Sequence, residues 1–173
     1  MTFTLRPARP DDAERLPAIE QSAAQAFLAC PGLEWIARDS GLSARQHQTY
    51  IAQGWEWLVV DEQDRPWGFI CGQDCGEHWH IVELSVHRAQ QGQGLGRQLI
   101  QRVGDWAREQ GYAGLTLTTF ATVPWNAPFY ARLGFEALGE HQLGDFLQRQ
   151  LAAEQAHGLS GRCAMRLEFQ PLS

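Results

Sequence analysis

The sequence predicts an α/β (or α+β) fold with a mixed, mostly antiparallel sheet of about seven strands flanked by helices. Two hydrophobic patterns predict this fold class, and the absence of a repeat or linker predicts a single domain. Between residues 55 and 87, apolar and polar residues alternate at period two and are separated by short turns, as in an antiparallel meander. From residue 94 onward, segments with a helical hydrophobic period alternate with segments of extended pattern. No internal repeat or linker interrupts the 173 residues, so we expect a single domain over 1–173.

The elements follow in order from hydrophobic period and from breaker residues. Pro17 implies a kink or a later start in the first helix. Ser43 and Gly54 are suited to begin and end the second helix. The expected strands cover residues 3–8, 55–62, 66–73, 78–87, 114–120, 135–140 and 163–169. The expected helices cover residues 9–27, 43–54, 94–111, 123–134 and 144–157.

Charge and composition exclude several functions. The net charge of −6 and the pI of about 5.5 argue against a nucleic-acid partner, which needs a basic face. All fourteen basic residues are arginine, so a P-loop lysine, a Schiff-base lysine and a lysine general base are excluded. We see no membrane span and no secretory signal, and therefore expect a cytoplasmic protein with reduced thiols.

Two cysteines and two histidines fall within ten residues, namely Cys71, Cys75, His78 and His80. All are residue types that bind zinc, but this spacing is not a common structural zinc pattern. We therefore expect no metal, with ordinary thiols and histidines beside a hairpin.

Residues 91–97 read QGQGLGR and lie between an expected strand and an expected helix. The first N–H groups of a helix lack internal partners, and glycines let an anion approach them closely. A P-loop is excluded without lysine, and a dinucleotide fingerprint fails because Arg97 stands where the third glycine belongs. The remaining pattern is Gln/Arg-x-x-Gly-x-Gly/Ala, matched by Gln91, Gly94 and Gly96.

The segment ELSVHRAQQGQGLGRQLI resembles the signature of the GNAT superfamily of acyl-CoA-dependent N-acetyltransferases, departing from it at Arg88, where proline is common. A second segment, NAPFYARLGF at 126–135, resembles a later helix of that family. The opening LRPARPDDAERL is also similar, so the resemblance runs from residue 3 to about 136. It implies a GNAT-like domain that binds acetyl-CoA. The cofactor-binding residues it implies are Leu84, Ser85, Val86, Gln91, Gly92, Gln93, Gly94, Leu95, Gly96, Arg97, Asn126 and Phe129.

The reaction that the resemblance implies is acetyl transfer from the thioester to an amine. The amine must lose a proton, and the leaving thiolate benefits from gaining one. Glu83, a carboxylate among apolar strand residues, is our candidate base, directly or through water, with His78 and His80 in reserve. The resemblance makes Tyr130 the candidate acid.

The acceptor is expected to be the primary amine of a small molecule. Five aromatic residues in the segments that usually form the acceptor pocket in this family suit an apolar or aromatic body: Phe27, Trp35, Tyr50, Trp55 and Trp125. The alternative is a non-catalytic module that binds an acyl-CoA as a sensor. Proteins of this family are often dimers, and the last expected helix, 144–157, is suited to support a homodimer.

Overall fold

The structure is a computed structural model that describes residues 1–171. Within these residues, seven strands form one mixed sheet in the order β1-β2-β3-β4-β5-β7-β6, accompanied by five α-helices, which confirms the predicted fold class. The strands are β1 (Thr4–Pro7), β2 (Glu56–Val60), β3 (Pro66–Cys75), β4 (His78–Val86), β5 (Gly114–Phe120), β6 (Glu136–Ala137) and β7 (Arg162–Glu168). The α-helices are α1 (Leu16–Ala24), α2 (Ala44–Gln53), α3 (Leu95–Glu109), α4 (Ala127–Arg132) and α5 (Asp145–Ala156).

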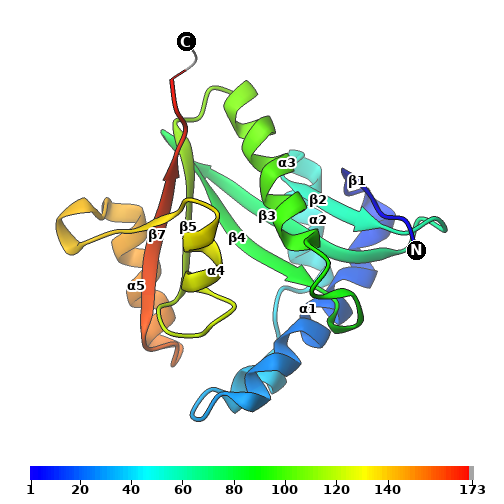
Figure 1. The fold of residues 1–173 in the computed structure, drawn as a ribbon, viewed down its shortest axis with the longest axis horizontal. Helices are drawn as coiled ribbons and strands as arrows, with labels where there is room; N and C mark the ends of the chain where they lie inside the picture. The colour runs from blue at the N-terminus through cyan, green and yellow to red at the C-terminus, as the bar shows by residue number, and fades with distance from the viewer. Residues whose placement is uncertain (172–173) are drawn as a thin grey trace. The chain divides into compact units, whose positions relative to one another are not determined.

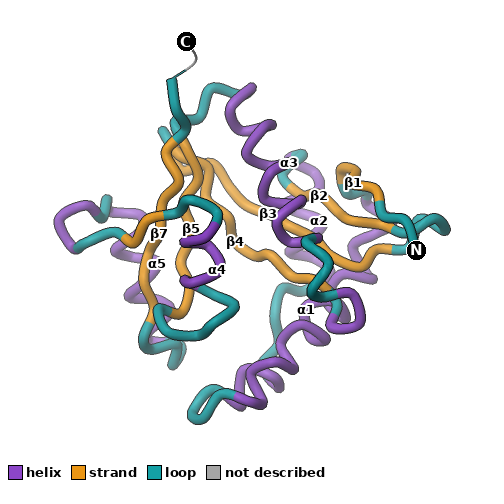
Figure 2. Tube along the Cα trace, in the orientation of Figure 1, coloured by secondary structure: helices purple, strands orange, loops and turns teal. Residues whose placement is uncertain are grey.

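The first expected helix, 9–27, is divided into three pieces. A 3₁₀ turn covers Pro10–Arg15, α1 begins at Leu16, and a second 3₁₀ turn follows at Gln25–Ala29. Pro17 lies in the first turn of α1, where its missing N–H removes no helical hydrogen bond. A further 3₁₀ turn at Glu34–Arg38 was not expected from the sequence. The two later turns, Gln25–Ala29 and Glu34–Arg38, lie on the chain between α1 and α2 (Figure 2).

Helix α2 has the ends that the sequence predicts. The Ser43 hydroxyl accepts a hydrogen bond from the Gln46 amide at 3.2 Å, and the Gln46 side chain accepts from the Ser43 amide at 2.8 Å. Gly54 ends the helix in the left-handed region at φ 75°. Both features are local, which is why the sequence was sufficient to predict them.

The chain divides into two compact units. The first contains Met1–Gln73 and Ile81–Asp105. Its core includes Leu16 and Ile19 of α1 together with side chains of β2 and β3. Figure 1 shows α3 beginning just after the loop that leaves β4. The apolar face of α3 is buried at Leu95, Leu99, Ile100 and Val103, as its helical period predicts.

The second unit contains Asp74–His80 and the chain from Trp106 onward. Strand β5 pairs antiparallel with β7 along its whole length and parallel with β4 over His78–His80. Buried Glu154 of α5 accepts hydrogen bonds from Thr118 of β5 at 2.6 Å and from Arg162 of β7 at 2.8 Å. These bonds fasten α5 to the two strands. No helix within residues 1–171 combines the length and apolar character that crossing a bilayer requires.

Candidate active site

The loop between β4 and α3 presents a run of backbone N–H groups. The Gln91 amide donates to Arg88 O at 3.4 Å, and the Gln98 amide donates to Gly94 O at 3.1 Å. Among the hydrogen bonds of residues 1–171, none has a backbone N–H between Gly92 and Arg97 as its donor. Unpaired N–H groups at the start of a fifteen-residue helix form a site suited to a phosphate or another anion.

Two glycines give this loop its shape. Gly92 and Gly94 have φ values of 82° and 78°, which side chains rarely adopt, and a Cβ atom on either would meet no atom within 4 Å. The glycines therefore allow a left-handed turn and also leave the space over the loop open. The Gln91 side chain closes the loop by donating to Val86 O at 3.0 Å, and the Gln93 side chain donates to Gln90 Oε1 at 2.7 Å.

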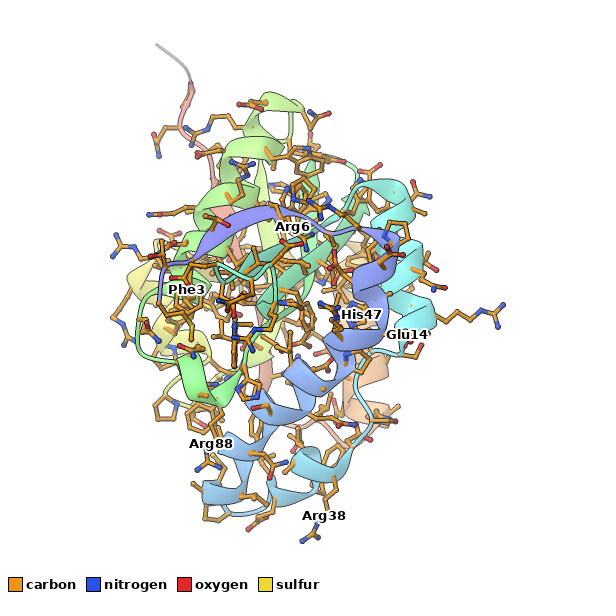
Figure 3. All side chains as sticks on the ribbon, turned by 90° about the vertical axis from the view of Figure 1, so that its right-hand side faces the viewer. Phe3, Arg6, Glu14, Arg38, His47 and Arg88 are labelled. Atoms are coloured by element: carbon orange, nitrogen blue, oxygen red, sulfur yellow. The ribbon has the colours of Figure 1, made fainter. Side chains whose placement is uncertain are left out.

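Arg88, the departure from the family pattern, has a structural role. Its backbone N–H donates to Ser22 Oγ of α1 at 3.0 Å, a bond that a proline could not make. The adjacent His87 Nδ1 accepts from the Ala89 amide at 3.1 Å. The Arg88–Ser22 bond could not be predicted from the sequence, because the two residues lie 66 positions apart. Figure 3 labels the Arg88 side chain.

Strand β4 alternates its faces as its period predicts. Ser85 is buried and Glu83 half-buried, and the Ser85 hydroxyl donates to Glu83 Oε1 at 3.1 Å. Leu84 and Val86, on the other face, are half-buried. The Glu83 carboxylate is thus fixed by a neighbour on its own strand.

The second unit holds the other predicted residues on and beside α4. The Asn126 side chain accepts from Thr119 Oγ1 at 2.7 Å and from the Phe120 amide at 3.4 Å, so its carbonyl oxygen is used inside the protein. Tyr130 is half-buried, and its ring lies 5.1 Å from the Phe129 ring. Thr119, which sequence reasoning missed, positions Asn126 from the end of β5.

His80 is buried on β4, with 2% of its surface exposed. Its Nδ1 lies 2.9 Å from Thr116 Oγ1, and the Phe146 ring meets it edge-on at 4.9 Å. Burial lowers the pKa of His80 to about 4, so the imidazole is neutral near pH 7. A neutral imidazole held by one hydrogen bond is chemically able to accept a proton.

The four cysteines are free thiols, and burial raises the pKa of Cys71 well above its ordinary value. The His78 ring bonds Glu168 at 2.7 Å, while His80 bonds Thr116. Within residues 1–171, no group of three or more His, Cys, Asp or Glu side chains is placed to hold a metal ion.

The structure places the predicted site residues in two sets. Glu83 to Val86 and the loop from Gln91 to Arg97 belong to the first unit. Asn126, Phe129 and Tyr130 belong to the second. The aromatic residues divide similarly, since Phe27, Trp35, Tyr50 and Trp55 are half-buried in the first unit, whereas Trp125 is 40% exposed in the second.

The model of the acetyltransferase (GNAT) family matches residues 21–135, which is more than half of the chain. The chain belongs to the GNAT acetyltransferase family. It is therefore an acyltransferase, and acetyl-CoA is its cosubstrate. The glycine loop suits the diphosphate of this cosubstrate, because its amides have no acceptor within residues 1–171 and a Cβ at Gly92 or Gly94 would meet no atom within 4 Å.

Solved structures share the fold at low sequence identity. PaiA N-acetyltransferase from Thermoplasma acidophilum, in complex with coenzyme A, has a TM-score of 0.74 and 14% identity, covering 98% of this chain and 100% of its own. The ribosomal-protein-S18-alanine N-acetyltransferase from Escherichia coli gives 0.69 and 18%, with coverages of 99% and 97%. N-acetylglutamate synthase from Neisseria gonorrhoeae, complexed with coenzyme A and N-acetyl-glutamate, gives 0.71 and 16%, with coverages of 99% and 36%.

We expect His80→Asn to change how stability depends on pH. Because burial lowers the pKa of His80 to about 4, the unfolded chain takes up a proton first as the pH falls. The stability due to neutral His80 is therefore present above about pH 6.5 and lost toward pH 4. The stability difference between the wild type and His80→Asn should shrink by about 3 kcal/mol between about pH 7 and pH 4, measured by urea unfolding.

His141→Asn, at an exposed histidine of the same unit, is the control and should show no such change. A stability difference for His80→Asn that stays constant with pH would contradict the neutral, buried state of the ring.

Proposed function

We propose that this acetyltransferase moves the acetyl group of acetyl-CoA to a primary amine of a small molecule, with Glu83 as base and Tyr130 as acid. The observation that carries the proposal is the run of N–H groups from Gly92 to Arg97, none of which donates a hydrogen bond within residues 1–171. Such a run is what a diphosphate requires of a protein backbone.

Other contacts would orient the rest of the cosubstrate. The parallel pairing of β4 with β5 ends at His80, so the β4 backbone around Leu84 and Val86 is our candidate for holding the pantetheine arm. Asn126 uses its side-chain oxygen on Thr119, which leaves its amide nitrogen to donate to the same arm. Arg97 is exposed beside the loop and adds positive charge there.

The cosubstrate supplies an activated acetyl thioester, and the protein supplies proton transfers. Glu83, directly or through a water, takes the proton that the amine must lose before its nitrogen can attack the carbonyl carbon. As the carbon–sulfur bond breaks, the Tyr130 hydroxyl donates a proton to the departing sulfur. The products are then an amide and free coenzyme A.

His80 remains the alternative base. Burial keeps it neutral, but a pKa of about 4, well below the working pH, makes it a weak proton acceptor. Glu83 therefore stays our first choice. The Ser85 hydroxyl, which donates to Glu83 Oε1, orients the carboxylate.

The acceptor proposal rests on the aromatic residues near the first helices. Phe27, Trp35, Tyr50 and Trp55 suit an amine with an apolar or aromatic body, and the net charge of −6 suits a cationic one. Burial raises the pKa of Tyr50 to about 12, so its hydroxyl stays neutral over the working range. A homodimer and a cytoplasmic location stay predictions from the sequence.

The deciding experiment is detection of free coenzyme A. The purified protein is incubated with acetyl-CoA and a panel of small primary amines, and thiol release is followed by a colorimetric reagent. We expect release above the hydrolytic background with at least one amine of the panel. Tight binding of coenzyme A without release for any amine would favour the non-catalytic module.

Gly94→Ala should raise the KM for acetyl-CoA by at least about tenfold, because a side chain forces the loop out of its left-handed turn and misaligns its amides. Gly111→Ala is a matched control. Gly111 also has positive φ, 92°, and no atom within 4 Å of an added Cβ, but it lies beyond the end of α3. Both changes should cost about 1–2 kcal/mol of stability, and only the first should change KM. Equal KM values for the two variants would argue against donor binding at this loop.

Tyr130→Phe should lower kcat by roughly ten- to a thousandfold, and Glu83→Gln by about a hundredfold or more, with KM for acetyl-CoA little changed. Thiol release at saturating acetyl-CoA measures both. Tyr112→Phe and Glu77→Gln, at residues outside the predicted set, serve as controls. If Glu83→Gln keeps full activity while His80→Asn loses it, the base is His80 and our assignment of Glu83 is wrong.

A further inference from the structure

We propose that a buried pair, His47 of α2 and Glu56 of β2, is a protonation-controlled latch that holds α2 against the sheet. His47 Nδ1 lies 2.7 Å from Glu56 Oε1, and both side chains are 0% exposed. In Figure 3 the His47 side chain points from α2 toward the strands, whereas Arg38 points outward. Neither residue has a part in the proposed acetyl transfer.

Each member of this latch makes only one of the bonds available to it. His47 Nε2 and Glu56 Oε2 are buried and have no hydrogen-bond partner among residues 1–171. The Phe69 ring meets His47 edge-on at 4.8 Å and offers no polar atom. The stability of a buried pair whose remaining polar atoms are unpaired depends strongly on the charge of the pair. No second partner is present to compensate a change in that charge.

The groups that face the latch are acidic or neutral. Asp12, on the 3₁₀ turn before α1, is engaged by Arg6 at 2.8 Å, and Arg6 and Arg9 also bond Asp64. Glu20 on α1 accepts from the Leu42 amide at 2.9 Å. The titratable groups that act on the pair or on Glu20 are Asp12, Glu20, Asp39, Tyr50 and Cys71. The hydrogen bond with His47 is therefore the main contact that offsets ionised Glu56.

The direction of the pH effect follows from burial. Burial raises the pKa of both Glu56 and Glu20, so the fold favours their protonated forms. The stability that they contribute is complete below about pH 4.3 and is lost as the pH rises through the raised values. Once Glu56 is ionised, its buried carboxylate has only the single bond to His47 among residues 1–171 to offset the loss of water. The latch is thus closed in mildly acidic solution and weakened in alkaline solution.

Glu20 holds the start of α2 by a separate contact. Its carboxylate accepts from the Leu42 amide, just before the Ser43 cap of α2, and this bond favours the ionised form of Glu20. Helix α2 covers Ala44–Gln53, and the protection of these amides reports on the latch.

Hydrogen exchange measured by mass spectrometry at about pH 6 and about pH 8.5 tests the proposal. After correction for intrinsic rates, protection of α2 should fall at least about tenfold at the higher pH, while α5 stays unchanged as the internal reference. Glu56→Gln should remove this pH dependence. Glu14→Gln, at an exposed glutamate labelled in Figure 3, should keep it. Equal α2 protection at both pH values in the wild type would overturn the latch.

If Glu56→Gln does not fold, the wild type alone decides by NMR. The side-chain carboxyl carbon signal of Glu56, assigned through its backbone connectivity, should titrate together with the α2 amide signals. Amide signals of α2 that do not follow the Glu56 titration, or a Glu56 carboxyl that does not titrate above the exposed Glu14, would overturn the proposal.

Discussion

The backbone amides between Gly92 and Arg97 are the constraint on which the functional part of this structure depends. The first N–H groups of a helix have no partner inside it, and within residues 1–171 these donate to no acceptor. The surrounding elements hold the loop in that condition. Gln91 ties it to the end of β4, Arg88 ties it to α1, and the buried face of α3 fixes its far end. The result is a donor array arranged before any ligand arrives, which reduces the entropic cost of binding.

Contacts with neighbouring residues also hold the predicted site residues of the second unit, Asn126, Phe129 and Tyr130. Asn126 is oriented by Thr119, and Tyr130 is packed between Phe129 and Phe135 on a helix of only six residues. Such a short helix has little stability of its own, so the packing of these rings decides where the tyrosine hydroxyl lies. Proton transfer in the proposed reaction therefore depends on the rigidity of β5 and β7, which are paired over their whole length.

Burial has different consequences at the two buried histidines, His47 and His80. His80 bonds a neutral threonine, and burial lowers its pKa to about 4, so it carries no charge near neutral pH. His47 instead bonds a carboxylate whose pKa burial has raised. The same residue type is a neutral hydrogen-bonding group in one unit and part of a titratable pair in the other, because the nearest polar partner differs.

The sequence by itself determined the features that are local along the chain. Hydrophobic period predicted the strands and helices, Ser43 and Gly54 predicted the ends of α2, and the glycines at 92, 94 and 96 predicted an anion loop. These follow from backbone geometry and near-neighbour hydrogen bonds. Contacts between distant residues were decided only by the tertiary structure. They include the Arg88–Ser22 bond, the Asn126–Thr119 bond and the burial of His47 with Glu56. No local pattern encodes them, because they arise when packed elements bring side chains together and remove water from around them.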